Sequence, residues 1–357
     1  MKTTNLFFIG TLLVLAIFAS GCIPEESLEN EMIYTNEIST GRMLLVLSAP
    51  SVDDPYYAPG FQQIVDFHVG YAEAIMGNDN VVVIVDEKTR PYYEDKLPED
   101  ILLTADLYDI WMRDFSTVNP EYPIQFTYTW ASMTESESKE VQNSFIAFAD
   151  QYQINREQTD LLLDGGNIVD NYAGRVITTT RFMEDNDLSY EEAKSALMEL
   201  LGAIEVAILE PDEEVLAHSD GMVSWVDKDV LLINDYSEYP DFRKLVMDEL
   251  RYAFPNVEFV EVPVEYGTNP PGVWEGFESS CGVNLNAVLT YENLYVPVFG
   301  MANDDDALVI IEDNTTRKVI PVNAEGVCGM GGSVRCLTWQ LTGENAEKLI
   351  FAARQEQ

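Results

Sequence analysis

The feature that most constrains the fold of this chain is an alternation of short apolar runs with stretches whose apolar residues recur at helical spacing. In the first of these stretches, one helical face carries Phe61, Ile64, Val65, His68 and Ala72. A chain that alternates strands with helices predicts an α/β fold. The runs with the length and composition of buried strands are residues 43–47, 81–85, 176–179, 206–209, 230–233, 257–262 and 286–298.

Capping and terminating residues mark further helices. Thr134 and Glu137 have the spacing of a capping box, which predicts that a helix begins there. Apolar spacing predicts two more helices, over residues 190–201 and about 241–254. Pro255 ends the last of these, because proline cannot continue a helix.

The chain beyond the N-terminal region has the pattern of a single domain. Residues 222–226 and 230–234 flank an Asp-Lys-Asp turn and predict a β-hairpin. No linker rich in Pro, Gly or Ser follows residue 45, and the chain is 46% hydrophobic, which is ample for a core. We therefore expect one folded domain over residues 43–357.

The N-terminus has the pattern of a processing signal. An apolar run over residues 7–19 is too short to span a membrane and is typical of a signal peptide. The cysteine that follows resembles a lipobox, although the usual Leu three positions before it is Ala19. We expect a lipoprotein signal peptide over residues 1–21, lipid attachment at Cys22, an acidic tether over residues 22–42 and an extracytoplasmic, membrane-anchored protein. The alternative is a plain secretory signal with an incidental cysteine.

The charge of the chain limits its partners. It carries 20 Lys and Arg against 62 Asp and Glu, a formal net charge of −42. Nucleic acid is excluded as a partner, because phosphate binding depends on a high density of Lys and Arg. A negative surface attracts cationic ligands. It is equally typical of adaptation to a saline environment, where screening shortens that attraction.

Acid–base chemistry has few candidates, because the chain has only two histidines. His68 lies on the apolar face of a predicted helix, which favours a structural role. His218 begins the segment His-Ser-Asp at residues 218–220. If this segment is extended, His218 and Asp220 point to the same side and place an acid/base next to an anion. The alternative is an ordinary loop carboxylate beside a histidine.

Three other segments add specificity: Trp-Met-Arg-Asp at 111–114, Asp-Gly-Gly-Asn at 164–167, and a glycine-rich stretch at 329–338 that contains Cys336. Together with the His-Ser-Asp segment, their order and separation resemble the guanidino-deiminase family that contains agmatine deiminases and bacterial, Porphyromonas-type peptidylarginine deiminases. The resemblance covers about residues 43–349. It implies a pentein fold, an α/β propeller of five ββαβ-like units around a central active-site channel.

The resemblance implies a hydrolase that converts a guanidino group to a ureido group and ammonia through a covalent amidino-thioether, with no metal or organic cofactor. It implies the catalytic residues Cys336 as nucleophile, His218 as general acid/base, and Asp114 and Asp220 as guanidinium-binding carboxylates. It also implies substrate contacts from Trp111, Gly166, Asn167 and Asn293, with Gly165 in the same loop. A guanidinium is delocalised and protonated, so carboxylates must hold it rigidly before a thiolate attacks.

The chain departs from the family pattern in ways that bear on its substrate. Arg335 precedes the nucleophile where the family often has His, and Phe-Ser-Thr at residues 115–117 replaces a common Gly-Pro. Residues 125–138 contain no Arg, although peptidylarginine-type members place arginines there that clamp a substrate carboxylate. Neither of the first two departures removes a catalytic group, whereas the missing arginines and the negative charge of the chain favour a small cationic, agmatine-like substrate. An arginine-containing peptide is the alternative, because an extracytoplasmic enzyme meets peptides.

Two other functions are compatible with the sequence. A non-enzymatic lipoprotein that binds cationic ligands would explain the lipobox and the acidity, but it would give the Cys-His-Asp set no purpose. A related amidino-transferring or dihydrolase activity would use the same residues. The oligomeric state is not predicted.

Two cysteines remain besides Cys22 and Cys336. In an oxidising compartment, the economical interpretation is that Cys281 pairs with Cys328 and leaves Cys336 free. The alternative is a Cys328–Cys336 pair, which would inactivate the nucleophile.

Overall fold

The computed structural model describes residues 36–38, 41–129, 134–269, 274–275 and 279–356. These residues belong to one unit, Tyr34–Gln357. The expected signal peptide, lipid attachment at Cys22 and most of the expected tether lie outside the described residues. Within the described residues, no helix has the length and apolarity that a membrane span requires.

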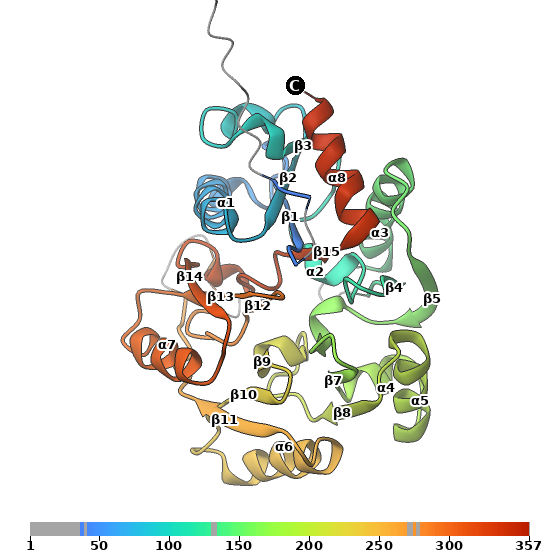
Figure 1. The fold of residues 1–357 in the computed structure, drawn as a ribbon, viewed down its shortest axis with the longest axis vertical. Coiled ribbons are helices and arrows are strands. Elements are labelled where there is room, and N and C mark those ends of the chain that lie inside the picture. Colours follow the sequence, from blue (N-terminus) through green and yellow to red (C-terminus); the bar gives the residue numbers. More distant parts are fainter. Residues whose placement is uncertain (1–35, 39–40, 130–133, 270–273, 276–278, 357) are drawn as a thin grey trace, which may run out of the picture. The chain divides into compact units, whose positions relative to one another are not determined.

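The described strands form five separate sheets (Figure 1). Their strand orders are β15 (Trp339–Leu341), β1 (Leu44–Ser48), β2 (Asn80–Val85) and β3 (Leu102–Thr104); β4 (Ile124–Thr127) and β5 (Glu157–Leu162); β6 (Val169–Asp170), β7 (Arg175–Thr179) and β8 (Glu205–Leu209); β9 (Val223–Asp227), β10 (Val230–Asn234) and β11 (Glu258–Val262); and β12 (Val288–Leu289), β13 (Asn293–Val298) and β14 (Lys318–Asn323).

The sheets share one plan. Two antiparallel strands are followed by a helix, and the helix leads to a third strand that pairs parallel to the second. In the sheet β6–β7–β8, helices α4 (Arg181–Asp185) and α5 (Tyr190–Leu201) lead from β7 to the parallel strand β8. Helices α6 (Pro240–Ala253) and α7 (Asp304–Asp313) make the same connection in the sheets of β10 and β13. Beside β4, a bridge between Val118 and Ile124 replaces the antiparallel strand, and α3 (Glu135–Gln151) leads to β5.

The remaining sheet joins the two ends of the described chain. Strand β15 is antiparallel to β1, and α1 (Phe61–Ile75) connects β1 to the parallel strand β2. Helix α8 (Gly343–Gln355) packs against β3. Figure 1 shows the five sheets with their helices arranged around a common centre. The five ββαβ-like units expected from the resemblance are confirmed.

Hydrophobic periodicity predicted many of these elements. The helix predicted over residues 190–201 is α5, and the predicted capping box of Thr134 and Glu137 begins α3. The predicted hairpin is the antiparallel pair β9–β10. The single strand predicted over residues 286–298 is wrong. The chain turns between β12 and β13, where the Thr290 hydroxyl accepts a hydrogen bond from the Asn293 N–H.

His68 has the environment of a structural histidine. It is fully buried in α1 among apolar residues, and its Nδ1 lies 3.0 Å from the hydroxyl of Tyr93. Burial lowers the pKa of His68 to about 3, so the imidazole is neutral at physiological pH. This agrees with the role expected from the sequence.

Candidate active site

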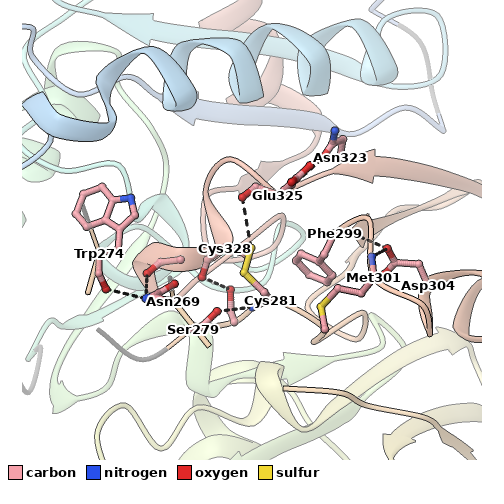
Figure 2. Close-up of a disulfide and its surroundings, with 12 residues drawn as sticks. Asn269, Trp274, Ser279, Cys281, Phe299, Met301, Asp304, Asn323, Glu325 and Cys328 are labelled. Carbon is pink, nitrogen blue, oxygen red and sulfur yellow. Dashed lines mark hydrogen bonds between the residues drawn. A yellow bond between two sulfur atoms is a disulfide. The ribbon is translucent and has the colours of Figure 1, made fainter. Parts of the chain in front are cut away.

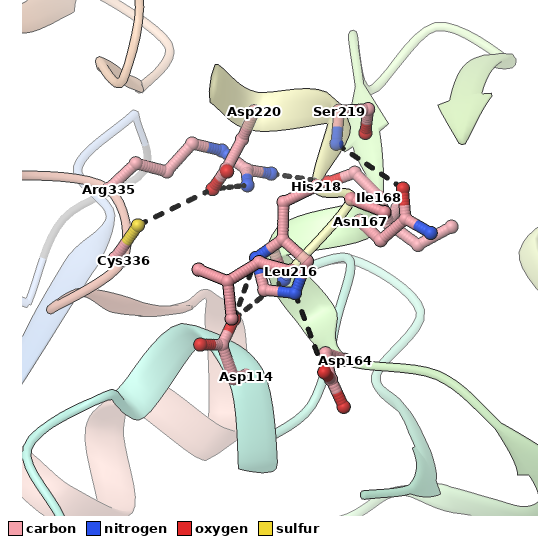
Figure 3. Close-up of polar contacts among 12 residues, drawn as sticks. Asp114, Asp164, Asn167, Ile168, Leu216, His218, Ser219, Asp220, Arg335 and Cys336 are labelled. Atoms are coloured by element: carbon pink, nitrogen blue, oxygen red, sulfur yellow. Dashed lines mark hydrogen bonds and ion pairs between the residues drawn. The ribbon is translucent and has the colours of Figure 1, made fainter. Parts of the chain in front are cut away.

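Four loop segments bring the expected catalytic residues together (Figure 3). Asp114 lies in the short helix α2 (Met112–Phe115), and Gly166 lies in the turn between β5 and β6. His218 and Asp220 belong to the turn before β9, and Cys336 belongs to the segment before β15. Each segment connects a different pair of sheets in the ring, so the cluster depends on the complete fold.

The backbone after His218 differs from the extended segment expected from the sequence. Ser219–Gly221 form a 3-10 turn, and His218 precedes that turn in an extended conformation. Two contacts favour the turn, because the Ser219 N–H donates to Oδ1 of Asn167 at 3.3 Å and the Met222 N–H donates to the Ser219 carbonyl. As a result, His218 faces two carboxylates while Asp220 faces Cys336 (Figure 3).

His218 lies between two acidic side chains. Its Nδ1 is 3.9 Å from Oδ1 of Asp114, and its Nε2 is 3.4 Å from Oδ2 of Asp164. Burial alone would lower the pKa of His218, but Asp114, Asp164 and Asp220 outweigh burial and raise it to about 9. The imidazolium therefore persists at neutral pH and can donate a proton to a leaving group.

Asp114 has a strongly raised pKa. Burial raises the pKa of Asp114 to about 7; Asp164 and Asp220 add to the increase, while His218 and the Gly166 N–H oppose it. The Gly166 N–H donates to Oδ1 of Asp114 at 2.9 Å and so fixes the carboxylate in place. Asp114 is therefore fully ionised only above neutral pH.

Cys336 is a free, buried thiol. Its Sγ lies 4.0 Å from Oδ2 of Asp220, and Nδ2 of Asn286 donates to it at 3.2 Å. Burial, together with Asp220 and Asp114, raises the pKa of the thiol well above its ordinary value. The resting group is therefore a neutral thiol, which would ionise only after a positive charge enters the site.

Asn286, rather than Asn293, is the asparagine at the nucleophile. Its Oδ1 accepts hydrogen bonds from the Ser333 hydroxyl and the Arg335 N–H, both at 3.0 Å, so it shapes the loop that carries Cys336. Asn293 instead donates to the buried carboxylate of Asp79 at 2.7 Å. The turn between β12 and β13 separates the two asparagines, and the substrate contact expected from Asn293 has no support in the geometry, because Asn293 does not line the cavity.

The Asp-Gly-Gly-Asn turn contributes a residue to which the sequence gave no role. Asp164 contacts His218, and its Oδ1 accepts a hydrogen bond from the Thr129 N–H at 3.1 Å. Asn167 is buried, and its Oδ1 accepts from the Thr179 N–H at 3.0 Å, so it ties the turn to β7. The substrate contact expected from Asn167 has no support in the geometry, because its side chain lies outside the cavity wall.

A cavity of about 920 Å³ opens beside Cys336, His218 and Asp220. A small recess adjoins it, lined by Trp111 and Asp114 together with His218 and Cys336. Trp111 packs closely on Gly332, where an added Cβ would lie 2.4 Å from the indole ring. The expected position of Trp111 as a pocket wall therefore agrees with the structure.

The outer wall of the cavity is acidic. Asp212 and Glu213 line it with Tyr266, and His218 is the only basic side chain among the described residues that line it. Oδ2 of Asp212 accepts hydrogen bonds from the hydroxyls of Tyr236 at 2.7 Å and Tyr266 at 3.2 Å, so this carboxylate is held in place.

A disulfide joins two parts of the cavity wall (Figure 2). Cys281 is bonded to Cys328, which confirms the predicted pairing and leaves Cys336 free. The Ser280 N–H donates to the Cys328 carbonyl at 2.9 Å, and both Ser280 and Met330 line the cavity. The disulfide therefore fixes one wall of the cavity to the loop that leads to the nucleophile.

Comparisons with known proteins agree with this geometry. The Porphyromonas-type peptidyl-arginine deiminase family matches residues 40–341 of the chain. The solved structure of an agmatine deiminase of C. jejuni is similar, with a TM-score of 0.71 and 20% identity over 86% of this chain and 96% of that one.

Two further solved structures have the same fold. An agmatine deiminase of Enterococcus faecalis has a TM-score of 0.69 and 16% identity over 86% of this chain and 95% of that one. A Porphyromonas gingivalis protein described as an arginine deiminase has a TM-score of 0.64 and 18% identity over 86% and 97%. None of the curated protein sequences compared with the chain matches it significantly.

Proposed function

The chain belongs to the Porphyromonas-type peptidyl-arginine deiminase family, and we propose that it hydrolyses a guanidino group to a ureido group and ammonia through a covalent intermediate on Cys336. One observation carries the proposal. A free thiol, a histidine between two carboxylates and a third carboxylate meet at one cavity. These are the groups that the attack of a thiol on a held guanidinium requires.

Binding uses the two carboxylates on either side of the thiol. Asp114 and Asp220 accept hydrogen bonds from the substrate guanidinium, whose planar array of N–H donors suits paired carboxylates. The bound cation also offsets the negative field that raises the pKa of the Cys336 thiol. Substrate binding therefore favours the thiolate at the moment when the guanidinium carbon is within its reach. The thiol proton passes to solvent, because His218 already carries a proton.

The first half-reaction forms the covalent intermediate. The Cys336 thiolate attacks the guanidinium carbon, a C–S bond forms, and the C–N bond to the departing nitrogen breaks. His218 donates a proton to that nitrogen, so ammonia leaves and an amidino-thioether remains. The field of Asp114 and Asp164 keeps His218 protonated for this step.

The second half-reaction returns the enzyme to its starting state. Water attacks the amidino-thioether carbon, and His218, now neutral, accepts a proton from it. The C–S bond breaks, the ureido product leaves, and the sulfur of Cys336 regains a proton.

Our favoured substrate is agmatine-like. The acidic outer wall of the cavity suits a substrate whose far end is an ammonium, and among the described lining residues no Lys or Arg is available to pair with a carboxylate. Free arginine and C-terminal arginine both carry a carboxylate at the end of the molecule opposite the guanidino group, where this wall would meet it. An internal peptidyl-arginine lacks that charge and stays the competing substrate.

The decisive experiment is an assay of the purified protein for ammonia and ureido products. Agmatine, free arginine and a peptide with an internal arginine are compared at low and high salt. We expect agmatine to give the highest kcat/KM. Turnover of the peptide alone would show that the substrate is peptidyl-arginine and not agmatine. Absence of both products with every substrate would contradict the proposed function.

Asp212→Asn tests the proposed contact with the far end of the substrate. The variant should raise the KM for agmatine by about tenfold, because a charge-assisted hydrogen bond to the ammonium is lost. Its kcat should change little, since Asp212 lies away from the reacting carbon. Butylguanidine, which lacks the amine, is the control and should show the same KM with both proteins. An equal rise in KM for the two substrates would contradict a specific role for Asp212.

Gly166→Ala tests the approach of His218 to Asp114. A Cβ on Gly166 would lie 2.4 Å from Nδ1 of His218 and 2.7 Å from Oδ1 of Asp114. Both side chains must shift, and we expect kcat/KM to fall by about 100-fold. The matched control is Gly221→Ala in the adjacent turn, where an added Cβ has no neighbour within 4 Å. Similar activities of the two variants would show that this close approach is unimportant.

A further inference from the structure

Arg335 occupies a position whose role the family resemblance does not supply. We propose that Arg335 is a positioning residue that orients the Asp220 carboxylate toward the substrate guanidinium and, through its fixed charge, favours ionisation of Cys336. The catalytic part of this inference rests on the proposed function. The contacts of Arg335 support it directly.

Both ends of the Arg335 guanidinium are held. Nη1 donates to Oδ2 of Asp220 at 2.8 Å, and Nη2 donates to the carbonyl of Ile168 at 2.5 Å (Figure 3). The Arg335 side chain is 9% exposed and that of Asp220 is 2% exposed, so water does not compete for this ion pair. A guanidinium anchored at two points fixes the orientation of its carboxylate partner.

The oxygen that Arg335 holds is the one that faces the nucleophile. Oδ2 of Asp220 lies 4.0 Å from Sγ of Cys336. With Oδ2 directed toward Arg335 and the thiol, Oδ1 is left to accept a hydrogen bond from the substrate. The backbone of Arg335 is equally fixed, because its N–H donates to Oδ1 of Asn286 at 3.0 Å. One short loop therefore carries both the nucleophile Cys336 and Arg335, the ion-pair partner of Asp220.

The charges around the thiol show why a cation is needed at this position. Asp114, Asp164 and Asp220 act on His218, and Asp114 and Asp220 also act on Cys336. Without Arg335, these carboxylates would be opposed by the His218 imidazolium and by Arg113, which acts on Asp220 without a hydrogen bond to it. Adding a thiolate to that field is unfavourable. The titratable and charged groups that face Cys336, His218 or Arg335 from the packed elements are Asp114, Asp164, Asp170, Asp220, Arg113 and Tyr172.

Removal of Arg335 should affect both Asp220 and the thiol. Asp220 would lose the hydrogen bond that fixes its orientation, which weakens its hold on a guanidinium. The thiol would lose a nearby positive charge, so its pKa would rise further. A purely structural arginine would change stability without these two effects.

The chain offers a matched control in Arg113. This arginine is also buried, at 3% exposure, but its Nη2 donates to Oε1 of Gln340 at 2.6 Å and it makes no hydrogen bond to Asp220. Arg113→Gln removes a buried guanidinium from the same neighbourhood. It should lower stability and leave the position of Asp220 unchanged.

The test compares the wild type with Arg335→Gln, Arg335→Lys and Arg113→Gln. Alkylation of Cys336 by iodoacetamide is followed across pH by mass spectrometry, and kcat and KM are measured with agmatine. At a given pH, Arg335→Gln should be alkylated about tenfold more slowly, which corresponds to a rise of about one unit in the thiol pKa. Its KM for agmatine should rise by at least about tenfold. Arg335→Lys should restore the alkylation profile but not the KM, because lysine supplies the charge without the two-point contact. Arg113→Gln should have a wild-type alkylation profile.

A wild-type alkylation profile and KM in Arg335→Gln would overturn the inference. A lower KM would also overturn it, because it would mean that Arg335 blocks the carboxylate. If Arg335→Gln does not fold, Arg335→Lys decides, since a wild-type KM in that variant would exclude the positioning role. If the wild type turns over no guanidino substrate, the proposed function fails, while the alkylation profiles still test the effect of the charge on Cys336.

Discussion

Cys336→Ala should turn over agmatine at least about 10⁴-fold more slowly than the wild type, because no other described group can form the covalent intermediate. Its affinity for agmatine should stay within a few-fold of the wild-type value. The raised pKa of Cys336 means that the resting enzyme holds a neutral thiol. Replacing that thiol with a methyl group therefore leaves the charge of the binding site unchanged.

Two measurements check this prediction. Calorimetric titration with agmatine gives the affinity of the variant, and mass spectrometry of acid-quenched wild-type enzyme detects the amidino adduct on Cys336. The variant should bind and form no adduct. Turnover by Cys336→Ala near the wild-type rate would exclude the covalent mechanism. Equal binding by both proteins with turnover by neither would instead indicate a non-enzymatic protein that binds cationic ligands.

The sequence predicted which candidate catalytic residues meet at the cavity because their chemistry is concentrated in short segments. His218, Asp220 and Cys336 each lie in a turn or loop whose glycines or turn residues permit close approach, and Asp114 lies in a short helix beside them. Such segments are recognisable without a structure. Gly166 is an example, since any side chain there would collide with His218 and Asp114. Asp164 belongs to the same segment as Gly166. Its role was missed because only the fold brings it to Nε2 of His218.

The features that the sequence did not predict depend on long-range contacts. Strand β15 pairs with β1 across almost the whole chain, and no local pattern specifies that pairing. Strand β5 is largely exposed, with the polar sequence EQTDLL, and β14 contains Pro321, so neither has the apolar run that identified the buried strands. The choice between Asn286 and Asn293 similarly depends on a turn that divides a continuous apolar run.

The second large effect concerns the ionisation of His218. The chain has two histidines, and they should behave in opposite ways in an NMR titration. His68 should stay neutral above about pH 5 because burial lowers its pKa to about 3, whereas His218 should titrate at about 9. Since the proposed mechanism needs a protonated His218 to release ammonia, kcat should fall as the pH rises through that value.

Asp164→Asn should lower the pKa of His218. The variant removes a carboxylate whose hydrogen bond and charge both raise the pKa of His218, so the imidazolium should lose its proton at a lower pH. We expect the midpoint of the His218 titration and the falling limb of kcat to move together toward neutral pH, by about one unit. Asp160→Asn, which removes an exposed carboxylate from β5, is the control and should move neither. If Asp164→Asn leaves the His218 titration unchanged, the carboxylate pair is not what keeps this histidine charged. If the titration moves while the falling limb does not, His218 is not the acid that releases ammonia.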